Sequence, residues 1–410
     1  MPSGNAAEPR DARFATAREA RGLAILLAAI SAMGPFAIDT YLPAFPSMAA
    51  GLGASLLEIQ QTLPAYMIPF ALMMFWHGPL SDAFGRRPLV IGGLLLFALA
   101  SVICALAPSV EWLWLGRALQ GMVGGAGMVV ARAMVRDLFD GVDAQKLMAT
   151  IMVMFGLAPG IAPVIGGALL AIADWRGIFV FLAVFPAVMA GVAWRMLPET
   201  LPPARRHRLH PVELTRACAR VLGHHGFRRL ALANSFNFIG LFLYVLAAPV
   251  FLIQHVGLTE QGFGWMFLPV VGGMMLGSAL SGRLAGALSA DRTIRLAVGV
   301  MTLAATGNLA ISALLPGGWW NIVPLVVFCG GMSLAMPSLQ VLALDLFPER
   351  RGLASSCLGV VQTGINALAA AVVVPLLWHS TLTLAAGMAG ALLLGTLAYA
   401  LSRRTHGTDP

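Results

Sequence analysis

The chain has 410 residues, of which 59% are hydrophobic and only 11% are charged, and its mean hydropathy is +0.83. Soluble proteins carry about 25% charged residues, so this composition excludes a soluble enzyme or binding module and indicates a membrane protein. The net charge of +8 would suit nucleic-acid binding, but the positive-inside bias of membrane proteins produces the same excess.

Twelve apolar runs, each bounded by charged residues, Pro or Gly, follow one another along the chain. Each is long enough to cross about 30 Å of hydrocarbon at about 1.5 Å per residue. A β-barrel would instead show alternating segments of about ten residues. We therefore predict an all-α integral membrane protein with twelve transmembrane helices, at residues 22–46, 59–77, 89–107, 112–133, 147–172, 177–196, 230–252, 263–281, 294–315, 321–344, 353–376 and 382–401.

The basic residues predict the orientation of these spans. All 26 except Arg117 and Arg176 lie in the two tails, in the loops on the N-terminal side of the membrane, or at the adjoining span ends. Because cytoplasmic loops are enriched in Lys and Arg, we expect a multi-pass protein of a bacterial inner membrane with both termini in the cytoplasm. This sorting also explains the pI of 10.1 without a nucleic-acid partner.

The longest hydrophilic stretch, rich in Pro and Arg, separates six spans from six. The halves repeat a similar spacing of span pairs and basic loops, and a parallel repeat places a central cavity between its two halves. We expect a cytoplasmic tail (1–21), an N-terminal six-helix bundle (22–197), a linker (198–229), a C-terminal six-helix bundle (230–402) and a second tail (403–410). The four cysteines lack disulfide-framework or metal-site spacing, so we expect no metal site. We also expect no cofactor, and a monomer.

Two ionisable residues lie inside predicted spans, Asp39 in the first and Arg117 in the fourth. Counted from the outer span ends, they lie at about the same depth. A charge there costs about 2.5–3.5 kcal/mol, which makes such a pair a functional candidate. Desolvation favours a protonated carboxyl and a nearby Arg favours the carboxylate, so we expect this pair to couple transport to protons. In the alternative, Asp39 reaches outer water and Arg117 bonds main-chain carbonyls.

The loop after the second span, residues 78–88, combines glycines, an aspartate and two arginines. Gly78 and Gly85 permit close approach and a tight turn, and Asp82 is suited to bind a helix N-terminus or an arginine. A plain turn with inside-positive charges is the alternative. The loop resembles the cytoplasmic signature of the major facilitator superfamily, although Ala83 stands where arginine is usual.

This resemblance implies a cytoplasmic latch in which Asp82 and Arg86 contact the fourth span and the start of the eleventh. The local partners that it implies are Arg132, Asp137 and Gly352.

The fifth span is rich in Gly and Pro. Small residues let helix backbones approach closely in lipid, and prolines bend a helix. The run resembles the antiporter motif of drug exporters in the same superfamily, where this helix packs against the eighth span, and so it favours export over import. Its candidate residues are Gly156, Pro159, Gly160, Pro163, Gly166 and Gly167.

Further short sequence motifs make the resemblance more specific. Residues 39–44, Asp-Thr-Tyr-Leu-Pro-Ala, are similar to the first-helix signature of the bicyclomycin-resistance and chloramphenicol-exporter branch. Residues 116–121 are similar to the fourth-helix motif of the superfamily, and Pro-Glu-Thr at 198–200 follows the sixth span. The C-terminal half is matched by its layout alone.

Polar side chains inside other spans are candidates to line the cavity, and the alternative is that they form interhelical hydrogen bonds. Three of them share one face of the seventh span. The candidates are Tyr41, Tyr66, Gln120, Asn234, Asn237, Tyr244 and Gln362.

Together these patterns predict a major facilitator antiporter that exports hydrophobic drug-like compounds in exchange for protons by rocking of two six-helix bundles. A metabolite exporter or importer of the same fold is the alternative. An enzyme is disfavoured because the sequence has no H-E-x-x-H, paired-carboxylate or cofactor-loop motif, and no residue is a catalytic candidate.

Overall fold

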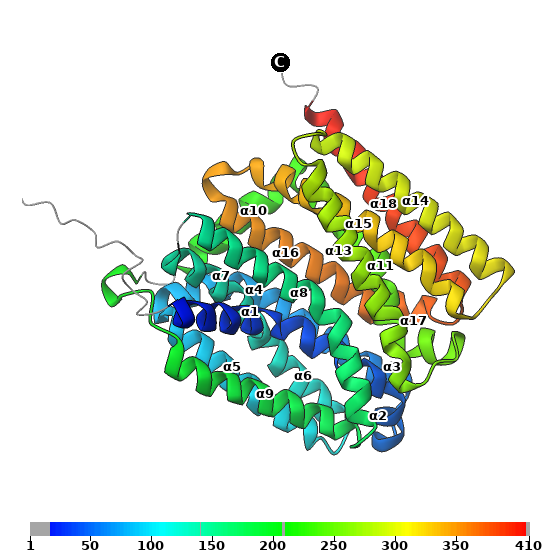
Figure 1. Cartoon of the computed structure of the whole chain (residues 1–410), viewed down its shortest axis with the longest axis horizontal. Coiled ribbons are helices and arrows are strands. Elements are labelled where there is room, and N and C mark those ends of the chain that lie inside the picture. The colour runs from blue at the N-terminus through cyan, green and yellow to red at the C-terminus, as the bar shows by residue number, and fades with distance from the viewer. Residues whose placement is uncertain (1–16, 140, 207–209, 407–410) are drawn as a thin grey trace, which may run out of the picture.

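The computed structural model describes residues 17–139, 141–206 and 210–406. In these segments the chain is mostly helical, and apart from one isolated bridge between Ala285 and Leu288 they contain no β-structure (Figure 1). The predicted all-α fold is confirmed.

The first half of the chain forms long helices joined by short turns. Its elements are α1 (Ala17–Asp39), the 3-10 turn η2 (Leu42–Ala44), α2 (Phe45–Leu52), α3 (Leu56–Gln60), α4 (Thr62–Phe84), α5 (Arg86–Ala105), α6 (Val110–Gly124), α7 (Ala126–Leu138), α8 (Gly141–Leu170) and α9 (Trp175–Met196).

A linker with one 3-10 turn, η3 (Pro203–Arg205), and one helix, α10 (Pro211–Gly223), leads into the second half. Two π-helical turns, η4 and η8, interrupt helices there. The elements are α11 (His225–Leu246), α12 (Ala248–Val250), η4 (Phe251–His255), η5 (Glu260–Phe263), α13 (Gly264–Leu284), α14 (Ala290–Leu314), η6 (Trp319–Ile322), α15 (Val323–Asp345), η7 (Pro348–Arg350), α16 (Arg351–Leu368), η8 (Ala369–Val373), α17 (Val374–Leu377) and α18 (Thr381–His406).

Eleven helical segments in the described residues are long and apolar enough to cross a membrane. The predicted second span corresponds to α4, which has 23 residues but contains Pro69, Pro79 and His77, and these lower its hydropathy. With α4, each of the twelve predicted spans has a helix at its place in the chain.

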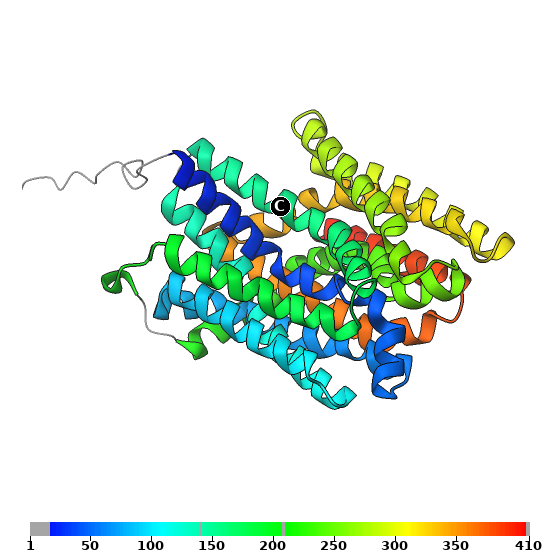
Figure 2. The same ribbon diagram turned by 60° about the horizontal axis from the view of Figure 1, so that its bottom comes forward.

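The helices form two groups (Figures 1 and 2). In the first, α5 packs along α9, α4 along α6 and α1 along α8; in the second, α11 packs along α18, and α15 along α13 and α14. Between the groups, α4 packs against α16 and α8 against α13. The predicted boundaries of the two bundles and the linker stay predictions.

Several predicted boundaries differ from the structure, among them the end of the second span: α4 continues to Phe84, so residues 78–84 of the predicted loop are helical and the turn lies at Gly85. The first span ends as an α-helix at Asp39, and the fourth is two helices separated by Gly125. Glycine has a low helix propensity, which favours the break at Gly125. The glycines near the break also allow α4 to pack close to α6: a Cβ added at Gly121 would overlap the carbonyl of Tyr66. The seventh span begins early, at His225, because the His224 ring accepts a 3.2 Å hydrogen bond from the Phe227 N–H and caps the helix.

The two groups also meet at the end of the bundle where α1 gives way to η2. There η2 contacts α12 and η5, and the side chains of Phe45, Phe251 and Phe263 are buried. A Cβ at Gly167 of α8 would lie 2.8 Å from the carbonyl oxygen of Glu260 in η5. This end of the bundle is therefore closed by direct packing between the two halves.

Candidate functional site

Asp39 is the last residue of α1. Pro43 has no N–H to donate to the Asp39 carbonyl, and the chain turns into η2 at this point. The Asp39 residue is 3% exposed, and its Oδ1 atom is buried without a hydrogen-bond partner. The break in the first span therefore holds a carboxyl group inside the protein with one oxygen unpaired.

Arg117, on α6, is completely buried. Its Nη1 donates to the carbonyl oxygen of Ala37 at 3.0 Å and to Oε1 of Gln120 at 2.7 Å. The guanidinium carbon lies 4.3 Å from the ring centre of Tyr41 and 4.4 Å from that of Tyr66. Two cation–π contacts thus hold the positive charge between aromatic faces, while Nε and Nη2 have no partner.

Two polar residues that the sequence analysis did not single out support this arrangement. Gln120 donates from Nε2 to the Ser101 hydroxyl at 2.7 Å, which orients the amide oxygen toward Arg117. The Tyr41 and Thr62 hydroxyls lie 2.8 Å apart. A single Ser or Thr in an apolar run is too common to reveal such a role, so only the contacts identify them.

Asp39 and Arg117 do not form an ion pair. No N···O distance of 4.0 Å or less joins them, yet Arg117 bonds Ala37, two residues before Asp39. The carbonyl bonding of Arg117 matches part of the alternative interpretation, whereas the 3% exposure of Asp39 leaves little contact with outer water.

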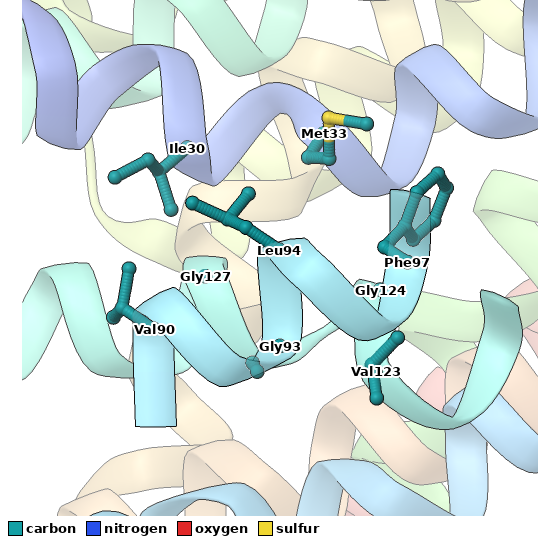
Figure 3. A pocket seen from close by; sticks show the side chains of 10 residues that line it. Ile30, Met33, Val90, Gly93, Leu94, Phe97, Val123, Gly124 and Gly127 are labelled. Carbon is teal, nitrogen blue, oxygen red and sulfur yellow. The ribbon is translucent and has the colours of Figure 1, made fainter. Parts of the chain in front are cut away.

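A small apolar pocket lies beside this site. Figure 3 shows Ile30 and Met33 of α1 facing Leu94 and Phe97 of α5, above Gly124 at the α6–α7 junction. Its volume of about 10 Å³ is close to that of one water probe. Drug-sized ligands need pockets of roughly 300–1,000 Å³, so this pocket is not a drug site.

The signature loop forms a cluster around Arg86, the first residue of α5. Its Nη1 lies 2.7 Å from Oδ1 of Asp82 and bonds the Ser81 hydroxyl at 2.5 Å, and its Nε lies 3.3 Å from Oδ2 of Asp137 on α7. Thr200, after α9, donates to the same Asp137 oxygen at 2.8 Å. Four chain segments therefore converge at this one arginine.

Glu199 completes the cluster. It accepts the Arg86 backbone N–H at 3.0 Å and so caps the N-terminus of α5, and its other oxygen lies 3.7 Å from Nη2 of Arg206. Gly85 has φ 104°, and a Cβ there would overlap the Glu199 carboxylate. Glycine is required here by both conformation and space.

The other implied latch residues lie outside these contacts. A Cβ at Gly78 would come no closer than 4.0 Å to Val129, and one at Gly352 would meet open space. Arg132 has a buried Nε without a partner. The contacts around Arg86 thus join α4, α5, α7 and the linker. Their role as a cytoplasmic latch, and contacts with the start of the eleventh span, stay predictions.

The glycine-rich fifth span, in α8, faces the second half. A Cβ at Gly160 would lie 3.0 Å from Val271, and one at Gly156 would lie 3.1 Å from Met274, both on α13. Gly167 lies against the backbone of Glu260 in η5. Pro159 and Pro163 lie within the same helix. The structure places this run against the eighth span, where the resemblance to drug exporters implies it.

The residues predicted to line a cavity lie in two different parts of the protein, some around Arg117 in the first half and the others on α11 and α16 in the second. Tyr41, Tyr66 and Gln120 surround Arg117 in the first half. On α11, Asn234 donates to Gln362 of α16 at 3.0 Å, whereas Tyr244 accepts a 2.7 Å hydrogen bond from Asn308 of α14. A Cβ at Gly395 of α18 would lie 2.7 Å from Oδ1 of Asn237. The three α11 residues therefore contact three different helices, and their lining of a cavity stays a prediction.

Two helical groups joined through α4–α16 and α8–α13, with a buried carboxyl and arginine in one of them, define a membrane transporter of the two-bundle class. Residues 25–371 match the Major Facilitator Superfamily, and the chain belongs to this family.

Relatives of the chain cover nearly its whole length. It is 28% identical over 376 residues to a bicyclomycin resistance protein homolog of Haemophilus influenzae, covering 92% of this chain and 94% of that protein. It is 32% identical to the MFS-type transporter YdgK of Bacillus subtilis (84% and 87% covered) and 29% identical to the multidrug resistance protein MdtL of Escherichia coli (80% and 82%).

The fold has a solved counterpart. A bacterial homolog of the human lysosomal transporter Spinster, in an inward-facing and unoccupied conformation, matches 95% of this chain and 98% of its own with a TM-score of 0.70. At 15% identity, this similarity shows the fold alone.

Proposed function

We propose that this protein is a proton-coupled multidrug efflux transporter of the bacterial inner membrane, acting as a monomer and without enzymatic activity. The observation that carries the proposal is the unpaired, buried Asp39 carboxyl in the same half as the buried Arg117, which bonds the Ala37 carbonyl two residues before it. The similarity to a bicyclomycin resistance protein homolog of Haemophilus and to a multidrug resistance protein of Escherichia supports export rather than import.

Asp39 is the proton carrier in this proposal. An isolated carboxylate is costly to bury, so the enclosed site favours the neutral acid. The unpaired Nε and Nη2 of Arg117 are donors that a small rearrangement can offer to the carboxylate, favouring proton release. Each proton that crosses inward contributes about 2.3 kcal/mol per 100 mV of membrane potential.

Alternating access uses the contacts at the two ends. Packing of η2 against α12 and η5 closes one end, which the basic-residue pattern assigns to the outside. Opening that end requires these contacts to separate while α4–α16 and α8–α13 serve as the packed surfaces about which the halves rock. The Arg86 cluster keeps the cytoplasmic ends of α4, α5 and α7 together as a rigid body.

The direct test uses inside-out vesicles acidified by respiration. The proposal predicts accumulation of a fluorescent drug analogue against its gradient, collapsed by a protonophore. Vesicles that release preloaded drug on acidification would instead indicate import in the cell and overturn the proposal.

Orientation is tested by fusing a reporter that is active only in the cytoplasm. We expect no signal from fusions near Pro108, Asp174 and Pro316, and strong signals near Ala144 and Pro211, because Lys and Arg gather on the latter side. A positive reporter near Asp174 would reverse the proposed topology.

The Arg86 cluster predicts a graded effect. Arg86→Ala removes three side-chain contacts of a group that is 12% exposed, whereas Asp82→Asn weakens one contact of a group that is 44% exposed. Exposed pairs contribute about 0–1 kcal/mol and hydrogen bonds to charged groups about 1.5–3 kcal/mol. We expect up to a fivefold loss of export for Asp82→Asn and a loss of at least about tenfold for Arg86→Ala, measured at equal amounts of protein in the membrane. Equal effects of the two changes would contradict the central place of Arg86.

A further inference from the structure

Three amide side chains form a second polar group, in the C-terminal half. Asn234 of α11 is completely buried and donates to Oε1 of Gln362 at 3.0 Å. Asn366 follows Gln362 by one helical turn on α16 and is 6% exposed. The Oδ1 atoms of Asn234 and Asn366 are both buried without a hydrogen-bond partner. We call these three residues the amide cluster.

The amide cluster lies beside the boundary between the two halves. Helix α16 packs against both α11 and α4 (Figure 1). Thr363, next to Gln362, donates to Sδ of Met74 on α4 at 3.8 Å, and a Cβ at Gly359 would lie 2.7 Å from the Met74 methyl group. The helix that carries two of the three amides therefore forms the contact with the opposite half.

The depth of the amide cluster is that of the middle of the membrane. Asn234 is the tenth residue of α11 and Gln362 the twelfth of α16, which places them roughly 14 and 17 Å from the helix starts. The hydrocarbon core is about 30 Å thick. Transporters of this two-bundle kind bind substrate at the midplane, at the interface of the repeats.

Two unpaired amide oxygens at this place need an explanation, because each unmade hydrogen bond of a buried group is costly. Three other asparagines of the C-terminal half, Asn237, Asn308 and Asn321, also carry unpaired oxygens. Asn237 lies against Gly395 of α18, Asn308 bonds Tyr244 and Asn321 bonds Ser312, all inside that half. In the N-terminal half, the Gln60 amide is also unpaired, on the short helix α3. In the amide cluster the free oxygens are acceptors next to the boundary that opens during transport. As neutral acceptors they match N–H and O–H groups and supply no counter-charge for a cation.

We propose that the amide cluster is a substrate subsite that accepts hydrogen bonds from neutral N–H or O–H groups of the transported compound. The inference rests on the proposed export function and names part of its substrate class. It separates two roles: Asp39 and Arg117 handle the proton in one half, and the amide cluster recognises hydrogen-bond donors from the other.

The test compares two cationic probes on the purified full-length protein in detergent. Ethidium carries two aromatic amines, whereas tetraphenylphosphonium has no N–H or O–H. Dissociation constants of both are measured by equilibrium dialysis for the parent, Asn234→Leu, Asn366→Leu and the control Asn321→Leu, which removes a buried amide elsewhere in the same half.

We expect Asn234→Leu and Asn366→Leu each to weaken ethidium binding about fivefold, the factor that one neutral hydrogen bond contributes. Tetraphenylphosphonium binding by the same variants stays at the parent value, which also shows that they are folded. Asn321→Leu leaves the ratio of the two constants unchanged.

The subsite is overturned if both probes weaken alike, if neither changes, if Asn321→Leu shifts the ratio equally, or if the parent does not bind ethidium. Failure of the export function is a separate result, seen as loss of proton-driven uptake in parent vesicles.

Discussion

Export driven by the proton gradient is expected to fall below detection when Asp39 is replaced by asparagine, while substrate binding persists. An amide cannot gain and lose a proton, and the buried position is otherwise preserved because Asn and Asp have nearly the same shape. Asp39→Glu keeps the ionisable group but moves it by one methylene, and we expect partial export with a shifted pH profile. Proton release induced by substrate, measured on purified protein as a function of pH, is the direct assay.

Glu58→Gln is the matched control for that assay. Glu58 lies on α3, fully exposed to solvent in a capping box with Ser55. The backbone N–H and hydroxyl of Ser55 hold the pKa of Glu58 below its usual value, so Glu58 stays ionised near neutral pH and its loss should leave proton release unchanged. Normal release from Asp39→Asn would contradict the assignment and move the search to Asp345, which pairs with Arg351 at 2.8 Å.

Arg117→Ala should eliminate export and also destabilise the protein. The change leaves the Ala37 carbonyl and the Gln120 amide without their donor, at about 1–3 kcal/mol for each unsatisfied group. It also opens a void between the rings of Tyr41 and Tyr66. We expect a clearly lower melting temperature in detergent together with loss of uptake in vesicles.

Arg117→Lys separates charge from geometry. Lysine retains the positive charge but lacks the planar group that stacks on two aromatic rings and bonds several acceptors at once. We expect lysine to restore part of the thermal stability and little of the export. Export by Arg117→Lys at the parent rate would show that a point charge suffices and that the aromatic contacts have no role in transport.

The membrane class, the helical fold and the family could all be predicted from the amino-acid sequence, because they depend on local properties. Hydropathy over about twenty residues decides whether a segment spans a bilayer. Motifs such as residues 78–88 and 156–167 are contiguous in the sequence, so their glycines, prolines and charges can be recognised without knowing the tertiary structure. The shared depth of Asp39 and Arg117 likewise followed from counting residues along two helices.

Contacts between distant residues were decided only by the tertiary structure. The sequence suggested an Asp39–Arg117 pair, but the arginine bonds Ala37 and Gln120 instead. Glu199 reaches the N-terminus of α5 across 113 positions of the chain.

The three polar residues on one face of α11 likewise meet three different helices. Periodicity gives the direction of a side chain from its own helix axis. Which neighbour lies in that direction depends on how all the helices pack, and in lipid that packing is set by small residues and interhelical contacts that no single segment contains.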